Sequence, residues 1–107
     1  LGVGCNNALN FDGTDDRIII PYNSSFNLNA SAFTIEYWAR PTLVNSQFHW
    51  LLGKDDNTTT DFLVGLSDNN KFRFNARNFP NWIDISGTTT PIVGTWYHVA
   101  NVFDGTT

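Results

Sequence analysis

Alternation of apolar and polar residues is the feature that most restricts the fold of this chain. It is clearest in residues 33–40, where Phe33, Ile35, Tyr37 and Ala39 alternate with Thr34, Glu36, Trp38 and Arg40. Successive side chains of a β-strand point to opposite faces, so the first set is expected to face the core and the second the solvent. No window of about a dozen residues shows the apolar spacing of three and four that marks a helix. The sequence therefore predicts β-strands and no helix longer than one turn.

Short apolar segments recur along the whole chain, separated by Gly, Asn, Asp and Pro residues that favour turns. Even spacing of many short strands is typical of an all-β fold, here an antiparallel two-sheet sandwich or jelly roll. The turn Asp68-Asn69-Asn70 tolerates left-handed backbone, which predicts a hairpin around it. The expected strands are residues 8–11, 17–21, 33–40, 48–54, 62–66, 72–76, 82–85 and 96–103.

The last of these segments carries a further expectation about the core. Residues 96–103 are apolar on both faces, which predicts a central strand covered on both sides. Trp96 is therefore expected in the core, together with Trp50 of an earlier segment. His98 stands between Tyr97 and Val99, so we expect a buried histidine that is hydrogen-bonded within the core.

Length and charge exclude several classes of protein. The chain has 107 residues and a mass of 12.0 kDa, enough for one domain with one core. Charged residues make up 15% and the formal net charge is −4, which argues against a polybasic nucleic-acid binder and a disordered acidic tail. No apolar run approaches the ~20 residues needed to cross a bilayer. We expect no nucleic-acid partner and no membrane insertion.

Cys5 is the single cysteine, so no disulfide can form within the chain. Two interpretations stay open: a buried thiol, or a bond to a cysteine outside this stretch. Neither His49 nor His98 has another His or Cys at the spacing of zinc ligands, so the sequence does not support a zinc site.

Three segments follow one another in an order that carries a family likeness. They are residues 8–18 (Ala-Leu-Asn-Phe-Asp-Gly-Thr-Asp-Asp-Arg-Ile), 33–38 (Phe-Thr-Ile-Glu-Tyr-Trp) and 94–105 (Gly-Thr-Trp-Tyr-His-Val-Ala-Asn-Val-Phe-Asp-Gly). Together they resemble laminin G-like domains of the concanavalin A-like jelly-roll fold. The resemblance implies a secreted or cell-surface protein with other domains in the same polypeptide.

The resemblance also implies that residues 1–107 are a single incomplete domain. Domains of this family continue past a turn like Asp104-Gly105 with a hairpin and a closing strand. A sandwich without them has unpaired sheet edges, so the 107-residue piece is expected to be marginally folded or prone to aggregate.

Three carboxylates crowd one short turn: Asp12, Asp15 and Asp16. Calcium takes six to eight oxygen ligands from carboxylates, backbone carbonyls and water, so the turn supplies part of a calcium site. Domains that this chain resembles often bind a structural calcium at the sheet edge, and the resemblance places Asp12 or Asp16 there. The alternative is that these residues only shape the turn by accepting hydrogen bonds from backbone N–H groups.

Residues 77–82 are the candidate ligand-binding segment. Sugar recognition needs an aromatic face for the apolar side of a pyranose, and amide or charged groups for its hydroxyls. Both kinds of group occur within these six residues, at a connection that contains a proline; the candidate site residues are Arg77, Asn78, Phe79, Asn81 and Trp82. The alternative is that Phe79 and Trp82 close the open end of the core.

A second candidate surface is the outward face of residues 33–40. Trp38 lies there between Glu36 and Arg40, which would let the three line one face of a sheet. The alternative is that a further layer of loops packs on this face.

Catalysis is not expected from these residues. Glycosidases use two carboxylates roughly 5–10 Å apart, whereas Glu36 is the only glutamate and its same-face neighbours are Thr34 and Trp38. We predict a non-catalytic carbohydrate-binding or adhesion module that binds a glycan or an extracellular protein. Two alternatives stay open: an accessory part of a glycan hydrolase or lyase whose acids lie elsewhere, and a structural spacer domain.

Overall fold

The computed structural model describes residues 7–28, 31–55, 60–78 and 81–105. Within them the chain forms β-strands and one 3-10 turn, with no helix of the length and hydrophobicity that crossing a membrane requires. The all-β prediction is therefore confirmed. The elements are η1 (Ser24–Phe26), β1 (Phe33–Ala39), β2 (His49–Asp55), β3 (Thr60–Leu66), β4 (Phe72–Asn78), β5 (Asn81–Ser86) and β6 (Tyr97–Phe103).

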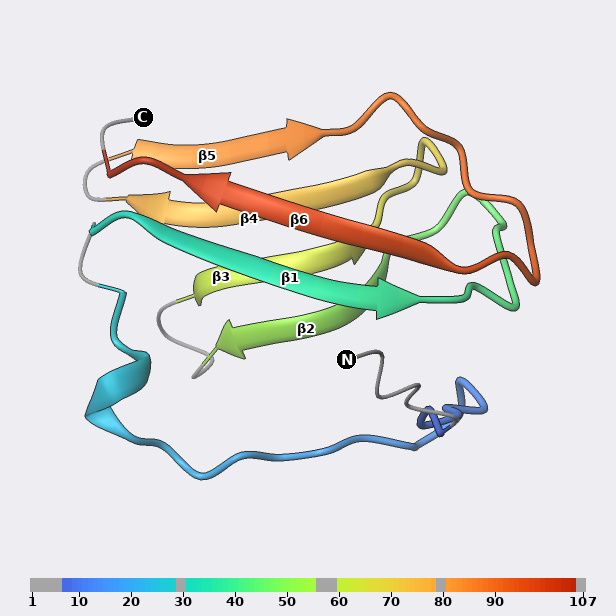
Figure 1. Cartoon of the computed structure of the whole chain (residues 1–107), viewed down its shortest axis with the longest axis horizontal. Coiled ribbons are helices and arrows are strands. Elements are labelled where there is room, and N and C mark those ends of the chain that lie inside the picture. Colours follow the sequence, from blue (N-terminus) through green and yellow to red (C-terminus); the bar gives the residue numbers. More distant parts are fainter. Residues whose placement is uncertain (1–6, 29–30, 56–59, 79–80, 106–107) are drawn as a thin grey trace, which may run out of the picture.

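The strands form two antiparallel sheets that lie face to face, which confirms the predicted sandwich (Figure 1). One sheet has four strands in the order β2-β3-β4-β5, a meander in which each strand pairs with the next along the chain. The other pairs β1 with β6, bringing together segments that are more than fifty positions apart in the sequence. Figure 1 shows this two-stranded sheet lying across the four-stranded one.

The core lies between the two sheets and is built from alternate residues of each strand. Val64, Phe74 and Ala76 of the four-stranded sheet are buried, and Phe33, Ile35, Tyr37, Phe62 and Ile83 pack against them. Phe33 meets Phe74 edge to face, with ring centroids 6.0 Å apart and an interplanar angle of 73°. The inward set predicted for residues 33–40 is thus confirmed, because the exposure of β1 alternates with every residue.

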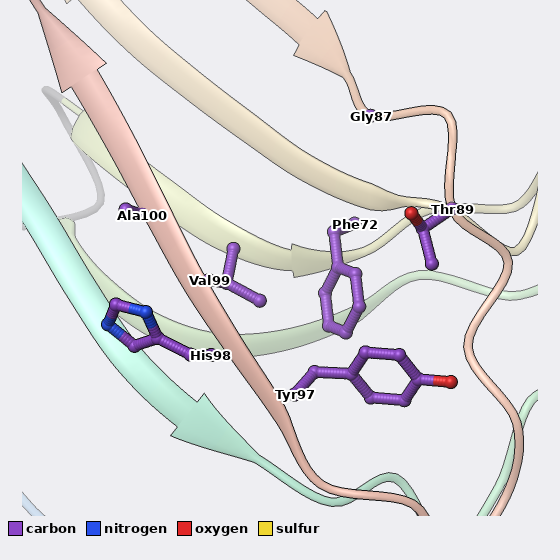
Figure 2. Close-up of a pocket in the computed structure, with 7 residues that line it drawn as sticks. All are labelled: Phe72, Gly87, Thr89, Tyr97, His98, Val99 and Ala100. Atoms are coloured by element: carbon purple, nitrogen blue, oxygen red, sulfur yellow. The ribbon is translucent and has the colours of Figure 1, made fainter.

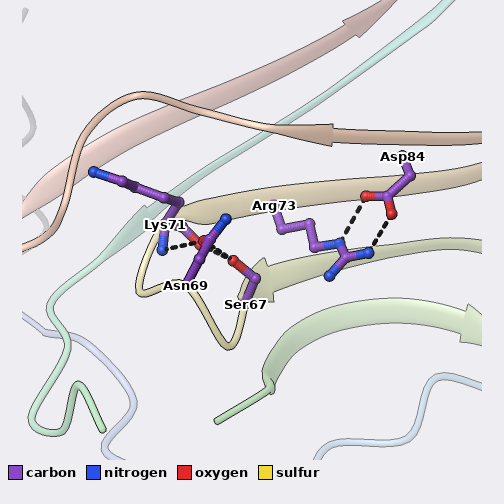
Figure 3. Close-up of polar contacts among 5 residues, drawn as sticks. All are labelled: Ser67, Asn69, Lys71, Arg73 and Asp84. Atoms are coloured by element: carbon purple, nitrogen blue, oxygen red, sulfur yellow. Dashed lines mark hydrogen bonds and ion pairs between the residues drawn. The ribbon is translucent and has the colours of Figure 1, made fainter. Parts of the chain in front are cut away.

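The hairpin between β3 and β4 turns where the sequence predicts it. Asn70 adopts a left-handed conformation (φ 60°), and its backbone N–H donates to the Ser67 carbonyl at 2.9 Å. The Asn69 side-chain oxygen accepts hydrogen bonds from the Ser67 hydroxyl and from the Lys71 backbone N–H (Figure 3). Asparagine stabilises such a turn because its short side chain replaces a backbone partner.

Strand β6 departs from the prediction that both of its sides are covered. Its exposure alternates, and Val102 on the outer side is 69% exposed whereas Phe103 on the inner side is 5% exposed. No described layer covers the outer side. The prediction of a covered outer side is wrong because single apolar residues such as Ala100 and Val102 also occur on exposed protein surfaces.

The predicted strands at 8–11 and 17–21 are not strands in the structure. A strand needs a neighbour to accept and donate its backbone hydrogen bonds, and no described strand pairs with either segment. Ile18, Ile19 and Ile20 are consequently 61%, 72% and 66% exposed. The arm formed by residues 7–28 is joined to β2 through Lys54, whose ammonium donates to Asn27 Oδ1 at 2.8 Å.

Removing a ring from the inter-sheet contact tests the position of the core. We expect Phe74→Ala to lower the free energy of unfolding by about 3–5 kcal/mol, or to unfold the chain outright, since the buried ring would leave a cavity. Trp38→Ala is the matched control, because Trp38 is 67% exposed and its loss should cost less than about 1 kcal/mol. Urea unfolding followed by circular dichroism measures both, and equal losses would contradict this core.

The exposed arm predicts self-association of the chain. Its apolar side chains and the open edges of the β1-β6 sheet are the two features that drive contact between copies. Ile19→Lys should reduce the concentration-dependent rise in sedimentation coefficient, because a charge opposes burial of the arm. Thr14→Lys, which adds the same charge at an exposed turn position, should not. A chain that stays monomeric at every concentration would refute this prediction.

Candidate functional site

The outer side of the two-stranded sheet carries an exposed set of aromatic and polar side chains. We call it the ribbon face. Alternation along β1 turns one set of side chains outward, and pairing with β6 places a second set beside them. Its members are Thr34, Glu36, Trp38, Arg40, Trp96, His98, Ala100 and Val102, all of which are exposed.

A cross-strand cluster occupies the middle of the ribbon face. Trp38 and His98 are directly opposite in the register, and their rings lie 5.2 Å apart with 34° between the planes. His98 Nε2 is 3.3 Å from Glu36 Oε2. The cluster thus sets an imidazole and a carboxylate beside an indole that is 67% exposed. Such groups offer both a flat apolar surface and hydrogen-bonding partners to a ligand.

Arg40 and Trp96 extend this arrangement at one end. The Arg40 guanidinium carbon lies 5.8 Å from the centroid of the Trp96 ring, a cation–π contact. Trp96 remains 48% exposed. Among the described residues, no carboxylate forms an ion pair with Arg40, whereas Lys54 pairs with Asp61 and Arg73 with Asp84.

Three residues expected in the core are instead exposed. Trp50 and Trp96 are 43% and 48% exposed, and the His98 side chain is 43% exposed. His98 and Trp96 share the outer side of β6, and no described layer covers it. Alternation along the strand is the sequence feature that places these two residues outside. Because Phe103 points inward, the even-numbered positions of this segment point outward.

A shallow hollow runs beside the inner edge of β6 (Figure 2). It has a volume of about 220 Å³, and the Phe72 and Tyr97 rings form its apolar side, with centroids 5.4 Å apart. The Tyr97 hydroxyl accepts a hydrogen bond from the Ile92 backbone N–H at 2.9 Å. The Tyr97 ring is therefore held in place by packing and by its hydroxyl, and it serves the core rather than a ligand.

The candidate segment 77–82 lies at the hairpin between β4 and β5. Arg77 pairs with Trp82, and Asn78 with Asn81, in the backbone register, so these four come to one end of the sheet. Phe79 lies outside the described residues, as do the side chains of Arg77, Asn78 and Asn81. The Trp82 side chain is 51% exposed on the side of the sheet that faces away from β1 and β6, so it does not close the core.

Two other aromatic side chains on that far side, Phe48 and Trp50, contact each other, and Phe48 also contacts Arg73. Phe48 and Trp50 stack with ring centroids 5.6 Å apart, and the Arg73 guanidinium lies 5.0 Å from the Phe48 centroid. Arg73 also meets Asp84 in a two-pronged ion pair, with Nε donating to Oδ1 at 2.7 Å (Figure 3). The Arg73 guanidinium is therefore already neutralised by Asp84.

Asp12, Asp15 and Asp16 come together as predicted, with one oxygen of each lying within 4.8 Å of the others. Two of them also shape the turn: Asp12 Oδ1 accepts from the Thr14 N–H at 2.8 Å, and Asp16 Oδ2 from the Asp12 N–H at 3.0 Å. Each carboxylate keeps a second oxygen, so the donor set fits a calcium ion that completes its shell with carbonyls and water. Exposed acidic turns of this shape also occur without an ion. Cys5 lies outside the described residues.

Comparison with known families assigns the fold. A laminin G-type family model, described as the concanavalin A-like lectin/glucanases superfamily, matches residues 12–107. The chain belongs to this superfamily. Neither the curated proteins nor the solved structures contain a significant match to it. The superfamily name covers both lectins and glucanases, so membership leaves the choice between binding and catalysis to the residues of the site.

Proposed function

We propose that this concanavalin A-like domain binds carbohydrate without catalysis, through the ribbon face. The observation that carries the proposal is the exposed Trp38 indole set beside His98 and Glu36 on a pair of hydrogen-bonded strands. The indole face suits the C–H side of a pyranose, and the carboxylate and imidazole suit its hydroxyls. A site on paired strands also keeps its geometry better than one on a loop.

We prefer the ribbon face to the far side of the four-stranded sheet because of the side-chain surface and hydrogen-bonding capacity that each leaves free for a ligand. Phe48 and Arg73 on the far side contact each other, and Asp84 neutralises the arginine. Trp38 and Arg40 on the ribbon face keep much of their surface and their hydrogen-bonding capacity for a ligand. Trp82, at the hairpin end of the far side, remains the alternative sugar platform.

The absence of catalysis is part of the proposal and is supported by the acids of the ribbon face. Hydrolysis of a glycosidic bond needs two carboxyl groups roughly 5–10 Å apart. Of the eight residues that define the ribbon face, Glu36 is the one acid, and His98 is its close neighbour. We propose a module of a larger secreted or cell-surface protein that attaches it to a glycan or a glycosylated extracellular partner.

Substitution of the two exposed tryptophans tests this function. Trp38→Ala should weaken binding to the glycans that the wild type selects on an array by about tenfold or more, since loss of a stacking face of about 1.4 kcal/mol corresponds to that factor. Trp82→Ala should leave glycan binding unchanged, and this variant should keep a melting temperature close to that of the wild type. The reverse result would move the site to the hairpin, and a wild type that selects no glycan would favour the spacer alternative.

We also propose that calcium stiffens the turn of residues 12–16. Binding to the folded state alone raises stability with ligand concentration, so millimolar CaCl₂ should raise the melting temperature. Asp16→Asn should abolish the rise because it removes one carboxylate of the cluster. Asp68→Asn, at an exposed turn elsewhere, should leave it intact. A melting temperature that chelator and calcium do not change would show that the cluster only forms the turn.

A further inference from the structure

We infer that the ribbon face takes an interior stretch of a linear polysaccharide that carries carboxylates, that is, a uronic-acid chain. This inference rests on the proposed function and specifies its ligand. Two independent observations carry it: the exposure of the face along its length, and the placement on it of a cation, Arg40, that pairs with no carboxylate among the described residues.

The shape of the face favours an extended chain. Strand β1 has seven residues and therefore runs for about 23 Å along the face. The two hollows beside β6 hold about 220 and 240 Å³, less than the pockets that usually enclose a small ligand. The face is exposed along its whole length, so a chain can lie along it without entering a pocket.

Two indoles on the face lie at a spacing that suits successive parts of one chain. Trp38 is opposite His98, and extending the register by one position past Tyr97 puts Trp96 diagonal to Trp38. Diagonal positions of this kind are roughly 7–8 Å apart at Cα. A chain lying across the ribbon would contact both rings with successive sugar units.

Arg40 is the residue that favours a negatively charged ligand. It lies over the Trp96 ring, is exposed, and makes no ion pair among the described residues. A guanidinium presents parallel N–H groups that match a carboxylate, which makes it the side chain of choice for binding one. A sugar acid stacked on Trp96 would place its carboxylate beside this group.

Glu36 does not cancel the attraction, because it lies at the other side of Trp38. It is four residues from Arg40 on the same strand, or about 13 Å along it. Its carboxylate is 3.3 Å from His98 Nε2 and is available there to sugar hydroxyls. The face is therefore polarised, with the cation at the Trp96 end and hydrogen-bond acceptors at the Trp38 end.

The experiment compares acidic chains with their own neutral esters. Hexasaccharides of galacturonate, guluronate, mannuronate and glucuronate, each with its fully methyl-esterified form, are titrated into the whole chain by calorimetry. We expect at least one acid to bind about tenfold more tightly than its ester, and added NaCl to reduce that preference. Arg40→Gln should remove the preference but keep ester binding, and Arg17→Gln, which neutralises an exposed arginine of the arm, should keep both.

Length dependence tests the other half of the inference. The trisaccharide should bind the wild type more weakly than the hexasaccharide, and the monosaccharide should not compete. A monosaccharide that competes at the affinity of the chain would overturn the interior-chain assignment. Equal binding of every acid and ester would overturn the assignment of charge while the proposed function stood. If Trp38→Ala left binding to every selected glycan unchanged, the proposed function itself would fail.

Discussion

Packing of the two sheets through one layer of aromatic and aliphatic side chains is the contact on which the rest of the structure depends. β1 and β6 form a two-stranded ribbon, an arrangement that is marginally stable in water by itself. Phe33 joins the ribbon to the larger sheet through Phe74 and to its own partner strand through Phe103, at 6.0 and 5.3 Å between ring centroids. This contact also sets the register, because a slip by one residue would turn every inward side chain to the solvent.

The layer of side chains between the two sheets includes two polar residues, Tyr37 and Asn101. Tyr37 is an inward residue of β1, and burial raises the pKa of its phenol to about 12, with the nearby Asn101 side chain opposing the shift. Asn101 is itself inward on β6, and its amide donates to the Ile35 carbonyl across the sheet at 3.4 Å. Within the described residues the Tyr37 hydroxyl has no hydrogen-bond partner. Polar groups are thus tolerated here at a cost, whereas the ionisable side chains of Glu36 and His98 on the same strands lie on the outer side.

The features that the sequence predicts correctly are those set by neighbouring residues along the chain. Alternation from Phe33 to Ala39 identified the inward set, and Asn70 marked the left-handed turn, since both depend on neighbouring residues only. The pairing of β1 with β6 joins distant segments, so no local pattern placed His98 beside Trp38. The segments 8–11 and 17–21 have good strand composition, yet a strand must pair with a neighbour, and no described strand pairs with either of them. Trp38, Glu36 and Arg40 were foreseen as a possible surface, whereas Trp96 and His98 were assigned to the core because of their apolar neighbours.

The separation of the inner and outer sides has a consequence for where specificity resides. Domains built on such sandwiches are expected to vary their ligands through loops, and the hairpin at residues 77–82 fits that expectation. The ribbon face offers another route, because its side chains on β1 and β6 alternate with inward residues of the same strand, and Arg40 and Trp96 directly adjoin these strands. A substitution at Trp38, Arg40 or Trp96 changes the ligand surface without entering the layer that holds the sheets together. Recognition can then diverge at these positions while the Phe33 contact, and with it the fold, stays the same.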